Sequence, residues 1–294
     1  MSSFFGSLVT AMITPFNSKL EIDYQKVEEL VDLLLRKGSD SLVVAGTTGE
    51  SPVLSEKEKL TLFKVVSNAS GGKVKVLAGA GSNNTQATLE FCQKAEKTGI
   101  DGLMLVAPYY NKPPQEGLYR HFSTIARSVS LPIMLYNIPG RTGVNLQVET
   151  TLRLAEIDNI VAIKEASGDL EQITAICDGA PDGFDVYSGD DSMTLPVLSA
   201  GGCGVVSIAS HLAGLEIKQM IDDFFNGDIK KAVRMHQKLM PFFKALFITT
   251  NPIPLKAALN LSGMNVGEPR LPLIPLPEKM SKTLKEVLDR YTFN

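Results

Sequence analysis

The sequence predicts a closed barrel of alternating strands and helices, the (β/α)8 or TIM-barrel fold, followed by a C-terminal helical extension. Short apolar runs recur eight times before residue 212, and segments with the period of an amphipathic helix separate them. Beyond residue 212 the strand pattern ends and the chain continues as helical segments. Because eight βα repeats with right-handed crossovers close naturally into a barrel, we expect a barrel over residues 1–212 and a helical region over residues 213–294 packed on it.

The expected strands are rich in Val, Ile and Leu and are apolar on both faces, as parallel strands covered by helices are. They occupy residues 8–13, 41–44, 74–78, 102–107, 132–137, 160–164, 184–188 and 205–209. An open, doubly wound parallel sheet is the alternative arrangement for such a pattern. Closure is favoured because no Gly-x-Gly-x-x-Gly motif follows the first strand and the eight units are nearly regular.

The segments between the strands carry apolar residues at i, i+3, i+4 and i+7, which places them on one face of a helix. This spacing occurs at residues 27–34, 62–69 and 118–129. Ser55 and Glu58 form a capping box before the second of these segments. The pattern therefore predicts the helices of the βα repeats.

Further helices are expected after the sixth strand and beyond the barrel. Asp169 is placed to cap a helix that follows the sixth strand. In the C-terminal region, helical patterns cover residues 217–225, 232–246, 254–261 and 279–291, and the proline-rich residues 272–277 form a stiff connector.

The composition excludes several classes of protein. A net charge of −3 provides no basic surface for nucleic acid or anionic membranes. No apolar run reaches the roughly 18 residues of a membrane span, and the first residues lack the features of a signal peptide. The three cysteines include no Cys-x-x-Cys pair, which favours reduced thiols (Cys92, Cys177 and Cys203). We expect a cytoplasmic protein that binds neither nucleic acid nor membranes.

Active sites of (β/α)8 barrels lie at the C-terminal ends of the strands. The polar and glycine-rich segments that follow the expected strands are therefore the candidate site. They cover residues 46–51, 79–84, 108–111, 136–143, 164–165 and 189–191.

Lys164 is the only lysine that ends one of the buried strands. Burial disfavours the ammonium form of a lysine, and a neutral amine is what attack on a ketone to form an imine requires. Three roles stay open from position alone: a nucleophile, an ion-pair partner of Glu165, or a phosphate-binding group.

The phosphate role is weakened by the neighbouring segments. The glycine-rich residues 201–204 precede the eighth strand and belong to the opposite end of the barrel, while Asp190 and Asp191 would repel phosphate. These two carboxylates could contribute to a metal site, but no histidine or third carboxylate lies at a neighbouring strand end. The histidines fall on or beside helices, where solvated or capping roles are expected (His121, His211 and His236). We expect neither a metal nor a cofactor.

Arg141 and Tyr136 accompany Lys164 on the expected rim. A guanidinium on a glycine-flanked loop presents a planar fork suited to a carboxylate. The alternative is a surface arginine tied to Glu149 or Glu50. Tyr136 ends the fifth strand, which adjoins the sixth in a barrel, so its phenol could lie near the lysine and relay protons. A core or rim tyrosine with no chemical role is the alternative.

Three motifs occur in order along the chain: Gly46-Thr47-Thr48-Gly49-Glu50, Tyr136-Asn137-Ile138-Pro139, and Lys164 on the sixth strand. Together they resemble the class I pyruvate-dependent lyases, the family of dihydrodipicolinate synthase and N-acetylneuraminate lyase. The resemblance covers essentially the whole chain. It implies a (β/α)8 enzyme that forms a Schiff base with pyruvate.

Residues Pro139-Gly140-Arg141-Thr142-Gly143 resemble the dihydrodipicolinate synthase branch, in which the arginine binds the carboxylate of L-aspartate-4-semialdehyde. The implied reaction condenses pyruvate with this semialdehyde to 4-hydroxy-tetrahydrodipicolinate, for lysine and diaminopimelate synthesis. Tyr109-Tyr110 also suits the branch, whose second tyrosine reaches into a neighbouring subunit's site. The resemblance thus implies at least a dimer and usually a homotetramer of two tight dimers. A pyruvate-dependent aldolase acting on a sugar acid and a non-catalytic pyruvate-binding barrel are the alternatives.

The resemblance also implies catalytic roles for four residues. Lys164 forms the imine with pyruvate, and the protonated imine accepts the electrons of the enamine carbanion. Thr47, Tyr136 and Tyr110 relay protons between the site and solvent, with Tyr136 as the acid and base.

Four further residues match substrate-binding positions of the family. Thr48 holds the pyruvate carboxylate through its hydroxyl and backbone N–H, and Arg141 holds the semialdehyde. Val206 borders the imine through its backbone carbonyl, and Gly189 lies nearby.

One departure from the family concerns inhibition by lysine. Members that are inhibited bind lysine at the dimer interface through polar residues that include a glutamate. Ser51, Asn83 and Tyr109 match this set, whereas the remaining positions are Pro52, Glu56, Lys59 and Ala87. The glutamate is missing and Lys59 adds a positive charge that repels a lysine ligand. We expect weak or absent inhibition by lysine.

Overall fold

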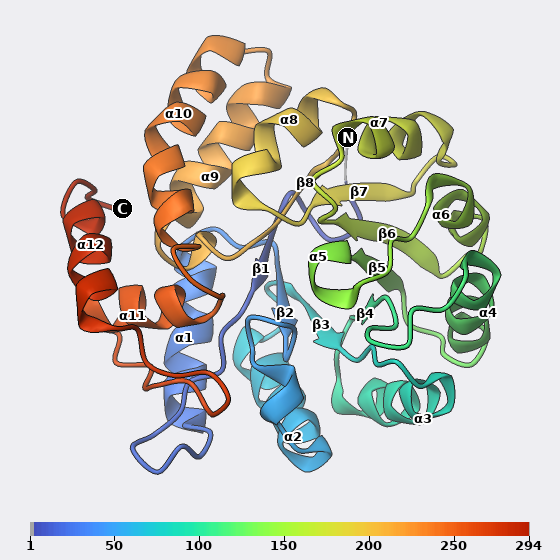
Figure 1. The fold of residues 1–294 in the computed structure, drawn as a ribbon, viewed down its shortest axis with the longest axis horizontal. Helices are drawn as coiled ribbons and strands as arrows, with labels where there is room; N and C mark the ends of the chain where they lie inside the picture. The colour runs from blue at the N-terminus through green and yellow to red at the C-terminus, as the bar shows by residue number, and fades with distance from the viewer. Residues whose placement is uncertain (1–2, 294) are drawn as a thin grey trace.

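The computed structural model describes residues 3–293, and its eight parallel strands close into a single barrel (Figure 1). Each strand pairs with the next in sequence, and β8 pairs back with β1. The strands are β1 Leu8–Ala11, β2 Ser41–Val44, β3 Lys75–Gly79, β4 Gly102–Val106, β5 Ile133–Asn137, β6 Ile160–Glu165, β7 Asp185–Ser188 and β8 Gly204–Ser207. Each expected strand overlaps one of these, so the predicted (β/α)8 barrel is confirmed.

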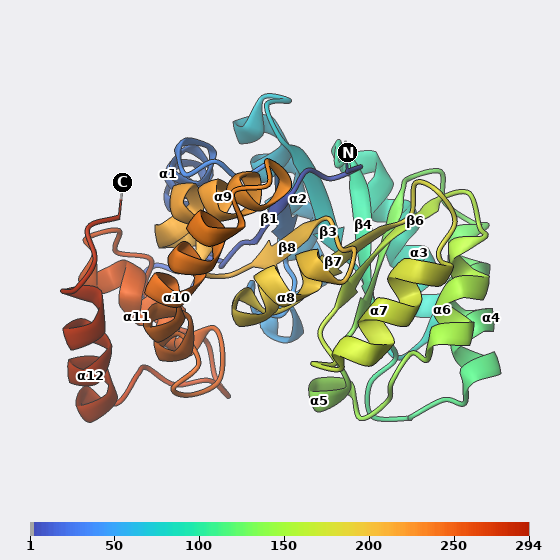
Figure 2. The same cartoon turned by 90° about the horizontal axis from the view of Figure 1, so that it is seen from above.

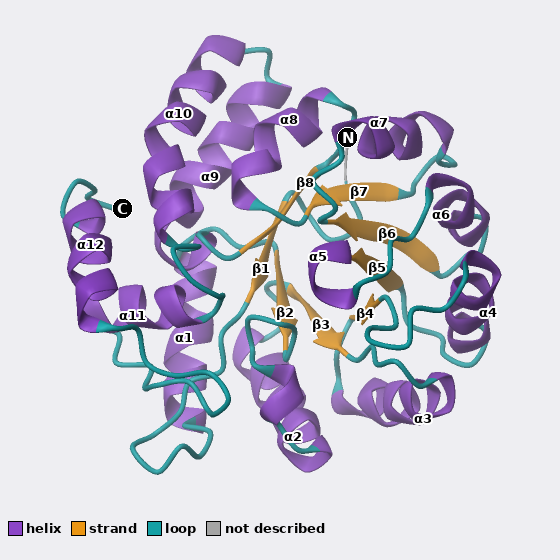
Figure 3. Ribbon diagram, viewed as in Figure 1, coloured by secondary structure: helices purple, strands orange, loops and turns teal. Residues whose placement is uncertain are grey.

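Helices form a ring around the strands (Figure 3). The outer helices are α1 Tyr24–Arg36, α2 Glu56–Ser70, α3 Thr85–Ala95, α4 Gln115–Ala126, α6 Val148–Ala155, α7 Leu170–Gly179, α8 Thr194–Ser199 and α9 Ser210–Phe225. The short α5 (Pro139–Thr142) lies inside this ring, near the ends of β5 and β6 (Figure 1). Two predicted caps are confirmed: Ser55 and Glu58 form the capping box of α2, and the Asp169 carboxylate accepts hydrogen bonds from N–H groups in the first turn of α7.

Three more helices pack on one side of the barrel, as the predicted extension requires (Figure 2). They are α10 Ile229–Ala245, α11 Ile253–Leu261 and α12 Glu278–Leu288. The division predicted at residue 212 stays a prediction: it falls within α9, beside the kink at Ala213. Of the helices in the described part of the chain, none combines the length and apolar character of a membrane span.

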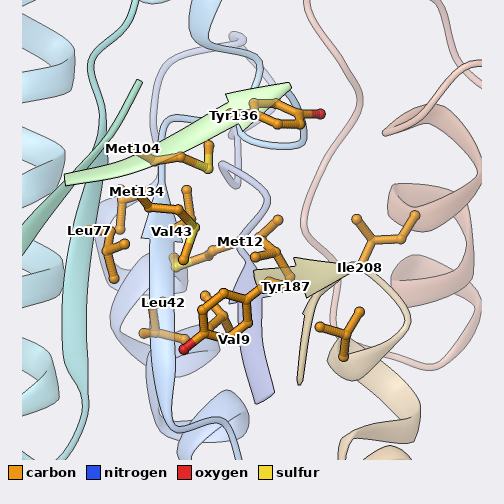
Figure 4. Packing of buried hydrophobic residues seen from close by; sticks show 14 of the residues in the cluster. Val9, Met12, Leu42, Val43, Leu77, Met104, Met134, Tyr136, Tyr187 and Ile208 are labelled. Atoms are coloured by element: carbon orange, nitrogen blue, oxygen red, sulfur yellow. The ribbon is translucent and has the colours of Figure 1, made fainter. Parts of the chain in front are cut away.

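The barrel interior is filled by side chains (Figure 4). Tyr187 is fully buried beside Val9, and its hydroxyl accepts a hydrogen bond from the N–H of Phe5 at 3.3 Å. At the other end of the packed interior, Tyr136 lies against Met104, and its hydroxyl points away from the apolar side chains. The interior is therefore a core and not a channel, with the Tyr136 hydroxyl toward the C-terminal ends of the strands and the Tyr187 hydroxyl toward their N-terminal ends.

Of the solvated or capping roles expected for the histidines, the solvated role is wrong for two of them, which are buried. His121 is 5% exposed and His211 is fully buried. Nε2 of His211 accepts the N–H of Ile13 at 3.2 Å, so Nδ1 carries the proton and donates to the carbonyl of Ile208 at 2.8 Å. The ring therefore joins the segment after β1 to the segment after β8 in its neutral form. Burial lowers the pKa of His211 from 6.5 to about 4.

This buried histidine predicts a loss of stability in mild acid. Between pH 6.5 and about 4 the unfolded chain binds a proton at His211 that the folded chain does not. Stability therefore falls as the pH drops, by at most about 1.4 kcal/mol per pH unit for this group. In urea unfolding from pH 6.8 to 5.2, the difference in stability between the wild type and His211→Gln should shrink as the pH falls. His121 is present in both proteins, so its contribution cancels in the difference in stability between them. A difference that stays constant would contradict this account.

Candidate active site

Lys164 and Tyr136 stand side by side at the ends of β6 and β5. They are register partners in the parallel ladder, and the Nζ atom of Lys164 lies 4.2 Å from the centre of the Tyr136 ring. Both side chains are buried, at 5% and 3% exposed. On the other side Lys164 pairs with Tyr187 of β7. A largely desolvated amine therefore lies against the ring of a tyrosine.

The ion-pair interpretation of Lys164 is wrong. The carboxylate of Glu165 accepts hydrogen bonds from the side chains of Asn137 and Gln172 and from the N–H of Ser167. Among residues 3–293, no carboxylate lies within ion-pair distance of the Lys164 amine. The amine is thus available for chemistry.

Gly189 leaves room for the Lys164 side chain. A Cβ atom at this position would lie 3.2 Å from Cε of Lys164 and 2.6 Å from Cβ of Ala166. The Gly189 N–H donates to the carbonyl of Glu165 at 2.7 Å, which fixes the loop after β7 against β6. A larger residue here would displace the lysine or the loop.

Val206 is buried in β8, and the residues after it are anchored by Asp191. The Asp191 carboxylate accepts the hydroxyl of Ser207 and the N–H groups of Ile208 and Ala209, the latter two at 3.0 Å. Full burial raises the pKa of Asp191 to about 6. Because β7 and β8 pair through Ser188 and Val205, Val206 lies at the level of Gly189. Asp191 thus positions the end of β8.

The loop after β2 carries both threonines. Thr48 is buried, and its hydroxyl accepts a hydrogen bond from Nδ2 of Asn251 at 2.9 Å. Thr47 is half-buried and lines a cavity at the barrel mouth. Glu50, two residues beyond Thr48, has left-handed backbone angles (φ 57°), an uncommon conformation for a residue other than glycine. The loop therefore needs external support.

That support comes from the C-terminal region. Lys256 of α11 places its ammonium 2.6 Å from Oε1 of Glu50, with both side chains 1% exposed. Oε2 of Glu50 accepts the N–H of Arg270 at 2.9 Å, and the Lys256 amine also lies 4.0 Å from the centre of the Phe16 ring. Burial lowers the pKa of Lys256, although Glu50 opposes this shift. The pair is a buried ion pair that fixes the threonine loop.

Arg141 lies on α5 with an exposed side chain that borders the same cavity as Thr47. Its Nη2 atom is 3.5 Å from the carbonyl of Asn251. The interpretation as a surface arginine tied to Glu149 or Glu50 is wrong, because no such pair occurs in the described chain and Glu50 is bound to Lys256. The guanidinium faces a cavity of about 440 Å³.

The cavity extends from the barrel mouth to α2 and α3. Thr47, Tyr136 and Arg141 line one part, whereas Glu56 and Lys59 line another. Tyr136 borders both the cavity and Lys164. The arrangement can therefore admit a small polar molecule from solvent toward the buried amine.

Tyr110 does not belong to this cavity. Its side chain is 88% exposed, and its backbone has left-handed angles (φ 74°), uncommon for a bulky residue. Its N–H donates to the carbonyl of Thr142 at 3.2 Å, next to Arg141. The structure thus brings together the other predicted residues around Lys164 and the mouth, and leaves Tyr110 pointing outward.

Sequence reasoning missed Asn251 and Lys256. Both lie more than 200 residues from the threonine loop that they contact. A signal for Lys256 was present, because a lone lysine within the apolar segment Ile253–Leu261 indicates a buried charge that needs a partner. Nothing local indicated that the partner would be Glu50.

The chain resembles known proteins over nearly its whole length. The model of the dihydrodipicolinate synthetase family matches residues 4–291. The 4-hydroxy-tetrahydrodipicolinate synthase of Bacillus subtilis is 56% identical over 288 residues, 96% of this chain and 99% of the relative. The 4-hydroxy-tetrahydrodipicolinate synthase 1 of Halalkalibacterium halodurans is 56% identical over 280 residues, 95% of each chain.

Solved structures agree with these relatives. The dihydrodipicolinate synthase of Bacillus anthracis superposes with a TM-score of 0.97 and 48% identity over 99% of both chains. The enzyme of Cyanidioschyzon merolae, solved with lysine bound, gives a TM-score of 0.96 and 49% identity over 98% of both chains. The chain therefore belongs to the dihydrodipicolinate synthetase family.

Proposed function

We propose that this chain is a 4-hydroxy-tetrahydrodipicolinate synthase, a lyase that condenses pyruvate with L-aspartate-4-semialdehyde in lysine and diaminopimelate biosynthesis. The observation that carries the proposal is the buried Lys164 amine, unpaired with any carboxylate of the described chain and 4.2 Å from the Tyr136 ring. Relatives that share more than half of their residues with this chain are synthases of this kind.

In this mechanism the neutral Lys164 amine attacks the ketone carbon of pyruvate, and loss of water gives an imine. The protonated imine draws electrons from the methyl group, which loses a proton and becomes the enamine carbon. That carbon attacks the aldehyde of the semialdehyde and forms the new C–C bond. The amino group of the same substrate then displaces Lys164 and closes the ring.

Tyr136 is suited to move protons in these steps because its ring lies 4.2 Å from the Lys164 amine, it lines the cavity, and its hydroxyl lies at the open end of the packed interior. Thr47 lines the same cavity and can pass protons toward solvent. Thr48, held by Asn251, offers a hydroxyl and a backbone N–H to the pyruvate carboxylate. Arg141 offers a planar pair of donors to the carboxylate of the second substrate.

The assembly and location follow the same proposal. The exposed Tyr110 supports a role in a neighbouring subunit's site and so at least a dimer, and the family resemblance extends this to a homotetramer of two tight dimers. The chain is then a cytoplasmic enzyme that works without a metal or cofactor, since the protonated imine formed on Lys164 is the electron sink.

Trapping of the imine tests the function directly. Borohydride added with pyruvate should attach one pyruvyl group to Lys164, and Lys164→Ala should abolish labelling and lower turnover by at least about 10³-fold. Peptide mass mapping locates the label, and a coupled assay compares aspartate semialdehyde with sialic acid and keto-deoxygluconate. Labelling at another residue would refute the mechanism, preference for a sugar acid would reassign the substrate, and labelling without turnover would indicate a binding protein.

Arg141 should determine the second substrate. Arg141→Ala should lower kcat/KM for aspartate semialdehyde by about 10²- to 10³-fold, because a charged hydrogen-bond pair is lost. The borohydride trapping rate with pyruvate alone should remain close to that of the wild type. Arg141→Lys keeps the positive charge without the planar guanidinium, and its kcat/KM for aspartate semialdehyde should lie between those of the wild type and Arg141→Ala. Equal losses in both assays would argue against this assignment.

Lysine should inhibit this enzyme weakly or not at all. Lys59 lines the cavity, and Glu56, an acidic residue that also lines it, is already paired with Lys94 at 2.7 Å. A lysine ligand would therefore meet a cation without the carboxylate that could bind its ammonium. Turnover should be nearly unchanged in lysine at about 1 mM, a concentration at the upper end of typical KM values. The double variant Lys59→His/Ala87→Glu should become sensitive to inhibition by lysine. Strong inhibition of the wild type at sub-millimolar lysine would overturn this prediction.

A further inference from the structure

We propose that Asn137 and Glu165 are positioning residues that hold β5 and β6 in the one register in which Lys164 stands beside Tyr136. Neither side chain touches the reacting atoms. The proposal rests on the proposed function only in taking Lys164 as the imine-forming residue.

The register of the β5–β6 ladder shifts by one residue between its two ends. Ile133 pairs with Ile160 at the start of the strands, and Tyr136 pairs with Lys164 near their ends. Tyr136 lies three residues beyond Ile133, whereas Lys164 lies four residues beyond Ile160, so β6 holds one extra residue. The irregularity falls between the pairs of Ile133 and Met134 and is a β-bulge.

The bulge decides which way Lys164 points. Side chains alternate between the two faces of a strand, and paired residues share a face. A regular ladder begun at Ile133 and Ile160 would pair Tyr136 with Ile163, and Lys164 would then point to the opposite face from Tyr136. The catalytic pair therefore exists only while the bulge is kept.

One anchor fixes the register at the start of the strands. The carbonyl of Asn159 accepts the N–H of Ile133 at 2.7 Å. Its side-chain amide donates to the carbonyls of Ala126, Val129 and Leu131 at 2.9, 3.2 and 3.4 Å. The chain entering β6 is thus tied to the chain entering β5.

A second anchor fixes the register at the ends. Asn137 is fully buried and Glu165 is 2% exposed. Nδ2 of Asn137 donates to the Glu165 carboxylate at 3.0 and 3.2 Å, directly beyond the Tyr136–Lys164 pair. The other donors to this carboxylate are the N–H of Ser167 at 2.7 Å and Nε2 of Gln172 at 3.0 Å. The cross-strand bond exists only in the shifted register.

The two anchors fix registers that differ by one residue, and the extra residue of the bulge in β6 accommodates this difference. Because β6 also pairs with β7, loss of the end anchor does not slide the whole strand; it lets the end of β6 relax locally against β5, which displaces Lys164 from Tyr136. If the starting anchor is lost, the same relaxation occurs below the bulge and leaves Lys164 in place. Loss of either anchor should therefore affect stability, but only loss of the end anchor should affect imine formation.

Glu165→Gln tests this with little change of shape. The new amide replaces one acceptor oxygen by a donor, so at least one of the surrounding N–H groups loses its partner. The rate of borohydride trapping of pyruvate on Lys164, and kcat/KM for pyruvate, should fall by about 10- to 100-fold because the amine is misplaced. KM for aspartate semialdehyde should change little, since Glu165 does not hold Arg141. Asn159→Ala is the matched control at the other end of the same strands and should trap pyruvate at nearly the wild-type rate.

Exchange of the two groups provides a rescue. Asn137→Asp alone places two carboxylates against each other and should slow trapping further than Glu165→Gln. The double variant Asn137→Asp/Glu165→Gln restores an amide facing a carboxylate across the strands and should recover most of the lost rate. All rates are compared at a temperature at which circular dichroism shows each variant to be folded.

The outcomes separate this inference from the proposed function. A wild type that traps no pyruvate overturns the proposed function, and the positioning role with it. A wild type that traps pyruvate, with a folded Glu165→Gln variant that traps it equally fast, overturns the positioning role alone. Equal slowing by Glu165→Gln and Asn159→Ala also overturns it, because the effect is then a general loss of packing. If Glu165→Gln does not fold, Gln172→Met, which removes one donor from the half-buried end of the network, replaces it under the same criteria.

Discussion

Each strand of the barrel is hydrogen-bonded to a neighbour on both sides, so a strand cannot change its register without breaking two ladders at once. This constraint sets the positions of Lys164, Tyr136 and Gly189, which come from three consecutive strands or the loop after them. The close-packed interior of the barrel lies beneath them, and Lys164 is only 5% exposed. The reactive group therefore meets its surroundings only from the mouth.

The mouth in turn depends on the C-terminal region. The buried pair of Lys256 and Glu50 fixes the left-handed turn after the threonines, and Asn251 holds Thr48 from the same side. A buried ion pair adds little net stability over an apolar pair, but loss of one partner typically costs about 3–5 kcal/mol, because the other charge stays buried. Its value here is geometric: it specifies one conformation of a loop that has no support of its own.

Much of this could be predicted from the sequence, because strands, their order and their ends follow from local apolar patterns. That Lys164 and Tyr136 end neighbouring strands follows from the order of the fifth and sixth strands, but their direct pairing depends on the β-bulge. The β-bulge could not be predicted, since residues 160–163 form an uninterrupted apolar run and the mismatch arises only between two anchored ends. The ties from Asn251 and Lys256 could not be predicted either, because they depend on how a distant region folds back. The burial of His211 was missed for the same reason.

The dependence of the threonine loop on Asn251, Lys256 and Arg270 has a consequence for protein engineering. A gene fragment that ends with the eighth strand would encode all eight strands and still lack the groups that neutralise Glu50 and partner Thr48. Transplanting the chemistry to another barrel would require copying these distant residues together with the strand ends. The smallest portable unit of this site is thus discontinuous along the chain, although it is compact in space.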